Sequence, residues 1–173
     1  MSCAFLIWFK IITKEKVTEL FIQVFLECFY CFVISVGFCI IFNIKGRDIF
    51  YGGLGSALGW FLYLICYKRF ASIVGGYFLA TIATTLYSEY MAVHRKKPST
   101  IFLIPSIIPF VPGGVVFRAM SAWLNGDQNT LLIQGRYSIT IAGAIAMGII
   151  LGISTARLQR SCIKIFRTKI DQK

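Results

Sequence analysis

Five long apolar runs, separated by short polar stretches, dominate this sequence and limit the folds open to it. The hydrocarbon core of a bilayer is about 30 Å thick, which a helix of roughly 17 to 25 residues can cross. The runs have about this length and lie at 17–43, 49–67, 70–93, 100–124 and 132–155. A soluble domain would instead show amphipathic segments with polar faces. We therefore expect an all-α, polytopic transmembrane helix bundle with five spans.

The charge content supports a membrane environment. Charged residues make up 14% of the 173 residues, against roughly 25% in ordinary soluble domains. The 18 Lys and Arg residues outnumber the 7 acids and give a net charge of +11. In a soluble chain this excess would suggest nucleic acid, but here the basic residues lie between and after the apolar runs. We expect no nucleic acid partner.

The basic residues also predict how the chain lies in the membrane, because cytoplasmic loops carry an excess of Lys and Arg. With five spans, one side receives eleven of them: Lys45, Arg47, Arg95, Lys96, Lys97, Arg157, Arg160, Lys164, Arg167, Lys169 and Lys173. The other side receives five: Lys10, Lys14, Lys16, Lys68 and Arg69. We expect a multi-pass protein of the inner or plasma membrane with its N-terminus outside and its C-terminus cytoplasmic.

Three parts are expected along the chain. Residues 1–16 are too short to span and lack the pattern of a cleavable signal peptide, so they predict an interfacial segment. Residues 17–156 form a single transmembrane domain with all five spans. Residues 157–173 form a basic cytoplasmic tail, which either touches anionic lipid headgroups or is simply solvated.

Small residues recur at helix-packing spacing in the second and fifth runs. They are Gly55 and Gly59 in the second run, and Ala144, Gly148 and Gly152 in the fifth. Such spacing lets helix backbones approach closely in lipid. The pattern favours packing within this chain and packing against a second subunit equally.

The fourth run, IFLIPSIIPFVPGGVVFRAM (101–120), contains three prolines followed by two glycines. Each interior proline removes an amide donor and clashes with the preceding turn, so Pro105, Pro109 and Pro112 with Gly113 and Gly114 predict a broken helix. Irregular backbone at membrane depth needs protein or a water-filled cavity around it, and transporters place solute sites at such breaks. The alternative is a proline-kinked packing helix.

Four of the charged residues near or inside the runs are candidates for a functional or structural role. Arg118 follows the break and is suited to a solute carboxylate, or it pairs structurally. Glu27 lies deep in the first run and is a candidate for proton or cation coupling, with an ion pair to Arg118 or Arg136 as the alternative. Glu89 and Arg136, nearer to span ends, favour structural roles.

Other chemistry is poorly supported by the sequence. Cys28 and Cys31 have the spacing of a redox or zinc site, but they lie in an apolar run and read as small apolar helix residues. His94 stands in a basic loop without an acidic neighbour, and no hydrolytic or phosphate-binding motif is present. We expect no enzyme activity, no metal and no cofactor.

Three stretches together resemble the threonine/serine exporter family, and more closely the short, separately encoded subunit that corresponds to the C-terminal half of the fused exporter. They are GFCIIFNIKGRDIFYGGLGSALGW (37–60), KKPSTIFLIPSIIPFVPGGVVFRAM (96–120) and AGAIAMGIILGIS (142–154). The most specific element is the series of prolines and glycine ahead of an arginine. Phe117 stands where the family pattern leads us to expect Tyr.

The resemblance implies export of a small polar metabolite, either threonine and serine or a dicarboxylate such as succinate. It also implies a second, longer membrane subunit with a cytoplasmic N-terminal domain. The family's loop motif carries onto Pro105, Pro109, Pro112, Gly113 and Arg118. A membrane scaffold that transports nothing and stabilises or regulates another protein is the alternative.

Overall fold

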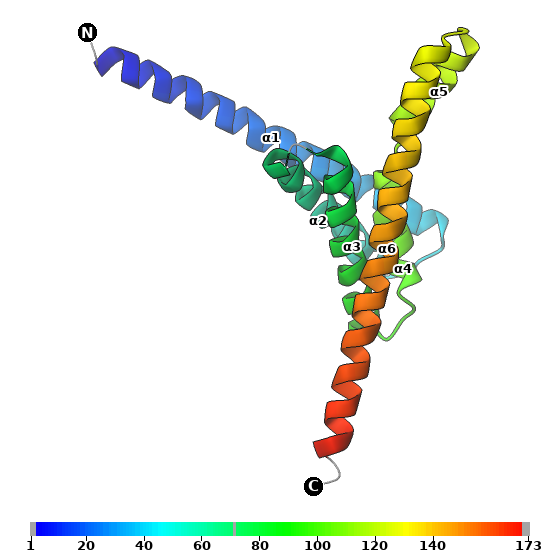
Figure 1. Ribbon diagram of the computed structural model, residues 1–173. Coiled ribbons are helices and arrows are strands. Elements are labelled where there is room, and N and C mark those ends of the chain that lie inside the picture. Colours follow the sequence, from blue (N-terminus) through cyan, green and yellow to red (C-terminus); the bar gives the residue numbers. More distant parts are fainter. Residues whose placement is uncertain (1–2, 71, 171–173) are drawn as a thin grey trace.

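The computed structural model of the chain describes residues 3–70 and 72–170, with side chains for 22–69 and 72–159. Every regular element in these ranges is helical, which confirms the all-α prediction. The elements are α1 (Cys3–Ile41), α2 (Asp48–Phe70), α3 (Ile73–Arg95), α4 (Thr100–Ile107), the 3₁₀ turn η1 (Ile108–Phe110), α5 (Gly113–Leu124) and α6 (Gln128–Ile170) (Figure 1).

The first and last helices are longer than the apolar runs within them. Helix α1 has 39 residues and α6 has 43, so neither breaks at the predicted boundaries near residues 16 and 156. Residues 2–36 and 153–170 contain no proline or glycine, the residues that most readily end a helix. The interfacial segment and the basic tail therefore stay predictions, since the backbone does not mark where the chain leaves the bilayer.

The span count differs from the sequence prediction. Among the described residues, three helices are long and apolar enough to cross a membrane, and a fourth span is formed if α4 with η1 and α5 count as one bent pair. Helix α3 is 23 residues long but is not among them. Helix α3 packs between α2 and α6, so the count of five spans stays a prediction that rests on α3.

Polar residues on the buried face of α3 explain its low hydropathy. Thr81, Thr84, Thr85 and Ser88 are buried. Each hydroxyl donates to the backbone carbonyl four residues earlier, at 2.6 to 2.9 Å. A helix enclosed by other helices can carry such hydroxyls, because they are satisfied without lipid contact.

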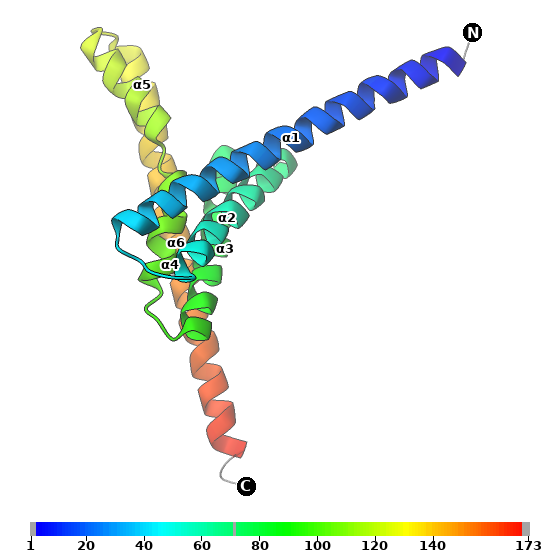
Figure 2. The same cartoon turned by 180° about the vertical axis from the view of Figure 1, so that it is seen from behind.

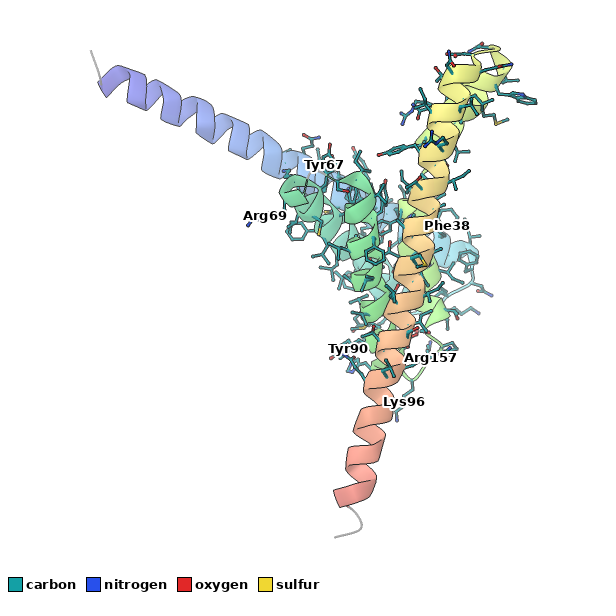
Figure 3. All side chains as sticks on the ribbon, viewed as in Figure 1. Phe38, Tyr67, Arg69, Tyr90, Lys96 and Arg157 are labelled. Carbon is teal, nitrogen blue, oxygen red and sulfur yellow. The ribbon has the colours of Figure 1, made fainter. Side chains whose placement is uncertain are left out.

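Helix α3 lies at the centre of the bundle. It packs against α2, α4 and α6, while α1 packs against α2. Helix α5 packs along the N-terminal part of α6, and these two segments project together away from the other helices, as does the N-terminal part of α1 (Figures 1 and 2). Lys96 and Arg157 lie near one end of the bundle, and Tyr67 and Arg69 lie near the other (Figure 3).

The predicted small-residue contacts are made within the chain. A Cβ atom on Gly152 of α6 would lie 2.7 Å from the Cβ atom of Thr85, and one on Gly148 would lie 3.0 Å from the backbone oxygen of Phe78. In α2, a Cβ atom on Gly59 would lie 2.8 Å from Cζ of Phe110 and would also meet Thr84. These glycines therefore set how closely α2 and α6 approach their neighbours.

The Gly59 contact predicts a stability difference. We expect Gly59→Ala to lower the stability by about 1–3 kcal/mol, because the added methyl group overpacks a buried contact. The matched control is Gly143→Ala, since a Cβ atom on Gly143 would meet nothing within 4 Å and alanine raises helix propensity. Thermal denaturation of the detergent-purified protein measures both. Equal melting temperatures for the two variants would contradict this packing.

Candidate functional site

The predicted break in the fourth run is present. Helix α4 ends at Ile107, η1 follows, and α5 begins at Gly113, with a bend of 49° between the two halves. Phe110 of η1 is fully buried, and its ring centroid lies 5.8 Å from that of Trp60 and 6.3 Å from that of Tyr77. Aromatic residues of α2 and α3 therefore hold the break in place.

A pocket of about 530 Å³ lies beyond the break, between α5 and α6. Its lining residues are Arg118, Ile133, Gln134, Arg136, Tyr137 and Thr140. Two of these are cationic and none is acidic, so the pocket favours an anion. Arg118 and Arg136, which the sequence had offered for separate roles, are brought to one site.

Helical spacing explains how these residues meet. Arg136 and Thr140 are four residues apart on α6, with Ile133 and Tyr137 on the same stripe, so their side chains share a face. The Thr140 hydroxyl donates to the backbone oxygen of Arg136 at 2.8 Å. Arg118 reaches this face from α5, one helical turn after Gly114.

The helix turn above the pocket is fixed by Asp127. Its Oδ1 accepts a hydrogen bond from the backbone amide of Thr130 at 3.1 Å, which caps the start of α6. The side-chain and backbone hydrogen bonds from Thr130 lower the pKa of Asp127. The side chain therefore stays an acceptor at neutral pH, and α6 starts at a defined residue.

The other residues predicted to bind solute lie at the break and outside the pocket lining. Pro109 and Pro112 are half-buried, whereas Gly113 and Gly114 are exposed. A Cβ atom on either glycine would meet nothing within 4 Å. This face of the break is open in the single chain, and the roles of these four residues stay predictions.

Glu27 lies next to Trp60, one of the aromatic residues that contact Phe110 at the break. It is half-buried on α1, and its Oε2 accepts a hydrogen bond from Nε1 of Trp60 at 3.1 Å. Its Oε1 accepts one from Nε2 of Gln23, also at 3.1 Å. Both of these hydrogen bonds come from neutral donors, and neither comes from Arg118 or Arg136. Through Trp60 the carboxylate is connected to Phe110 and hence to the break.

Glu89 and the cysteines are placed within the helices. Glu89 is 7% exposed and lies on the buried face of α3. Of the cysteines with described side chains, Cys31 and Cys39 are buried, Cys28 and Cys66 are half-buried, and all four are free. Within the described residues, no group of three or more His, Cys, Asp or Glu side chains could hold a metal ion.

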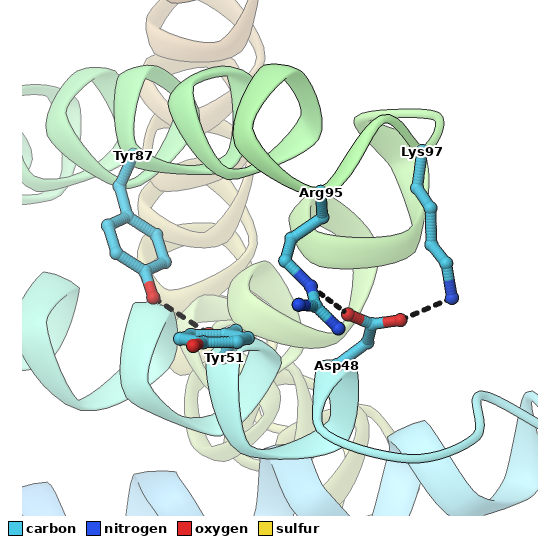
Figure 4. Close-up of polar contacts among 5 residues, drawn as sticks. All are labelled: Asp48, Tyr51, Tyr87, Arg95 and Lys97. Atoms are coloured by element: carbon cyan, nitrogen blue, oxygen red, sulfur yellow. Dashed lines mark hydrogen bonds and ion pairs between the residues drawn. The ribbon is translucent and has the colours of Figure 1, made fainter.

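A second polar cluster lies at the opposite end of the bundle from the pocket. Asp48, the first residue of α2, is 1% exposed and accepts hydrogen bonds from Nε of Arg95 at 2.9 Å and from Lys97 (Figure 4). The Arg95 guanidinium also lies 5.5 Å from the ring centroid of Tyr51, and the Tyr87 hydroxyl donates to the backbone oxygen of Tyr51 at 3.1 Å. The cluster joins the start of α2 to the turn between α3 and α4.

We expect Asp48→Asn to lower the stability by about 1–3 kcal/mol, because it leaves two cations beside a buried neutral group. The expected loss lies below the range for fully buried ion pairs, since Arg95 and Lys97 are partly exposed to solvent. The control is Asp127→Asn, because asparagine caps a helix as well as aspartate does. Chemical denaturation would compare the two, and an Asp48 variant as stable as the control would refute the role of this cluster.

The sequence did not single out several of these residues. Tyr137, Gln134 and Thr140 look like ordinary members of a long apolar run, and only their spacing from Arg136 signals a shared face. Asp48 was identifiable as the one acid in the basic stretch 45–48. A single acidic residue at the start of a helix, with cationic residues close by in the sequence, indicates a candidate ion pair.

Comparison with known proteins places these features in one family. A family model described as "Threonine/Serine exporter, ThrE" matches residues 27–155. No curated protein and no solved structure gives a significant match to the chain. The matched range takes in the break, the pocket and Glu27, and it covers most of the sequence. The chain therefore belongs to the threonine/serine exporter family of multi-pass membrane proteins.

Proposed function

We propose that this chain is the membrane subunit of a secondary exporter of small amino or carboxylic acids. The observation that carries the proposal is the pocket between α5 and α6, where Arg118 and Arg136 face one volume without an acidic neighbour. Guanidinium groups bind carboxylates with charge-assisted hydrogen bonds, often two at a time. The lining predicts a solute that carries at least one carboxylate.

The same lining favours a dicarboxylate such as succinate over threonine or serine. Two cations can meet two carboxylates. The ammonium group of an amino acid would find only the neutral acceptors of Gln134, Tyr137 and Thr140. For an amino acid, a carboxylate from outside the pocket would have to complete the site.

A second membrane subunit is part of the proposal. Among the described residues, those that line the pocket come from α5 and α6 alone, and Gly113 and Gly114 at the start of α5 are exposed. Polar side chains and irregular backbone at membrane depth require cover from protein or water. A longer partner with a cytoplasmic N-terminal domain would supply this cover. Both subunits would lie in the inner or plasma membrane, and the present chain would have its N-terminus outside and its C-terminus in the cytoplasm.

The test of the function is the flux of labelled succinate and L-threonine from proteoliposomes that contain the complete complex. We expect Arg118→Ala and Arg136→Ala each to lower the rate at subsaturating solute by about 10-fold or more, because a charge-assisted hydrogen bond is lost. The control is Arg157→Ala, an exposed arginine on α6 outside the pocket. Co-purification of the partner would check assembly.

Two outcomes would oppose the proposal. Normal flux from both pocket variants would remove the arginines from the mechanism. Flux that is identical with and without this chain would indicate a scaffold that transports nothing.

We further propose that Glu27 couples transport to a proton gradient. A carboxylate inside a membrane span is costly when ionised, and the two side chains that donate hydrogen bonds to Glu27, Gln23 and Trp60, are both neutral. Protonation would weaken its acceptor bond from Trp60, whose ring contacts Phe110 at the break. A change in the protonation of Glu27 would thereby alter the contacts of the bent span formed by α4, η1 and α5.

Replacing Glu27 separates coupling from binding. We expect Glu27→Gln to abolish flux driven by a pH gradient while solute exchange across the membrane continues, since the pocket is unchanged. The control is Gln23→Leu, which removes the other hydrogen bond to the same carboxylate and should leave coupling intact. Gradient-driven flux that survives in the Glu27 variant would exclude this residue as the coupling group.

A further inference from the structure

One buried hydroxyl stands out among the side chains that the structure describes. The Tyr137 oxygen has less than 1 Å² of exposed surface and no hydrogen-bond partner. A buried polar group without a partner is costly, and in native proteins such groups are few and often functional. The hydroxyl of Tyr87, by contrast, donates to the backbone oxygen of Tyr51 at 3.1 Å.

Tyr137 connects the pocket with the core behind it. Its ring packs against the buried cluster of Ala80, Phe110, Val115, Ile141 and Ile145. The same residue lines the pocket beside Arg118 and Arg136. The Tyr137 hydroxyl, which has no partner, therefore belongs to a residue of the pocket in which Arg118 and Arg136 would attract an anion.

We propose that Tyr137 contacts the solute directly and donates a hydrogen bond from its hydroxyl to the carboxylate that Arg118 and Arg136 attract. This inference rests on the proposed function. Because the hydroxyl is covered, the contact requires neighbouring side chains to move, and Arg118 and Arg136 are both long and exposed. The two arginine side chains are flexible and fix the position of a carboxylate poorly. A hydrogen bond from the Tyr137 hydroxyl, which is carried on a packed ring, would fix that position.

The test is Tyr137→Phe in the complete complex, because phenylalanine keeps the ring and removes only the hydroxyl. We expect the KM for succinate efflux to rise about 10-fold or more, with kcat largely kept, since a hydrogen bond to a charged group is lost. Without added succinate, the melting temperature should be unchanged or higher, because the removed hydroxyl had no partner. The rise in melting temperature on adding succinate should shrink.

The matched control is Tyr87→Phe, which removes a hydroxyl that donates within the protein, away from the pocket. It should lower the melting temperature and leave the KM for succinate unchanged. The two variants thus predict opposite patterns: Tyr137→Phe changes binding without loss of stability, and Tyr87→Phe changes stability without loss of binding.

The outcomes separate this inference from the function it rests on. If Tyr137→Phe keeps the normal KM while Arg118→Ala raises it, the role of Tyr137 is refuted and the pocket stands. If Tyr137→Phe lowers the melting temperature without succinate, the hydroxyl has a protein partner and the inference also fails. If neither Tyr137→Phe nor the two arginine variants alter succinate transport, the proposed function fails as well.

Discussion

The close contact between α3 and its neighbours is the interaction on which the rest of the structure depends. Lipid supplies no hydrophobic drive between helices, so helices associate through tight packing and internal hydrogen bonds. Here glycines meet hydroxyl-bearing residues: Gly59 of α2 faces Thr84, and Gly148 and Gly152 of α6 face Thr81 and Thr85. Because those hydroxyls donate along their own helix, a polar face is buried without an unsatisfied group.

This packing holds one half of the broken span against several helices and the other half mainly against α6. Ser106 of α4 is buried and donates to the backbone oxygen of Gly52 at 3.0 Å, and Phe110 lies in the aromatic cluster. Helix α5, in contrast, packs along α6. The break at Pro109 to Gly113 therefore separates a half held by several helices from a half held mainly by α6, with Val115 reaching the core, which suits a transporter that must change shape.

The sequence predicted the parts of this arrangement that depend on local chemistry. Proline geometry located the break, and small-residue spacing located the helix contacts. The sequence contains no signal for how far α1 and α6 continue beyond their apolar runs, because hydropathy marks the membrane-spanning part of a helix and not its ends. The shared pocket of Arg118 and Arg136 was also missed. The two arginines are 18 positions apart on different helices, and only the α5–α6 turn at Gly126, with its positive φ of 72°, brings them face to face.

The candidate coupling group and the candidate solute site lie on opposite sides of one aromatic cluster. Glu27 bonds to Trp60, Trp60 contacts Phe110, and Phe110 belongs to the core against which Tyr137 packs. A contact path alone does not transmit energy, since coupling requires an element with two arrangements that both sites favour differently. The bent span is that element in our proposal. Protonation at Glu27 and a carboxylate at Tyr137 would act on the same turn, η1, from its two sides. A proton gradient could therefore be coupled to solute transport although the proton and the solute bind at separate sites.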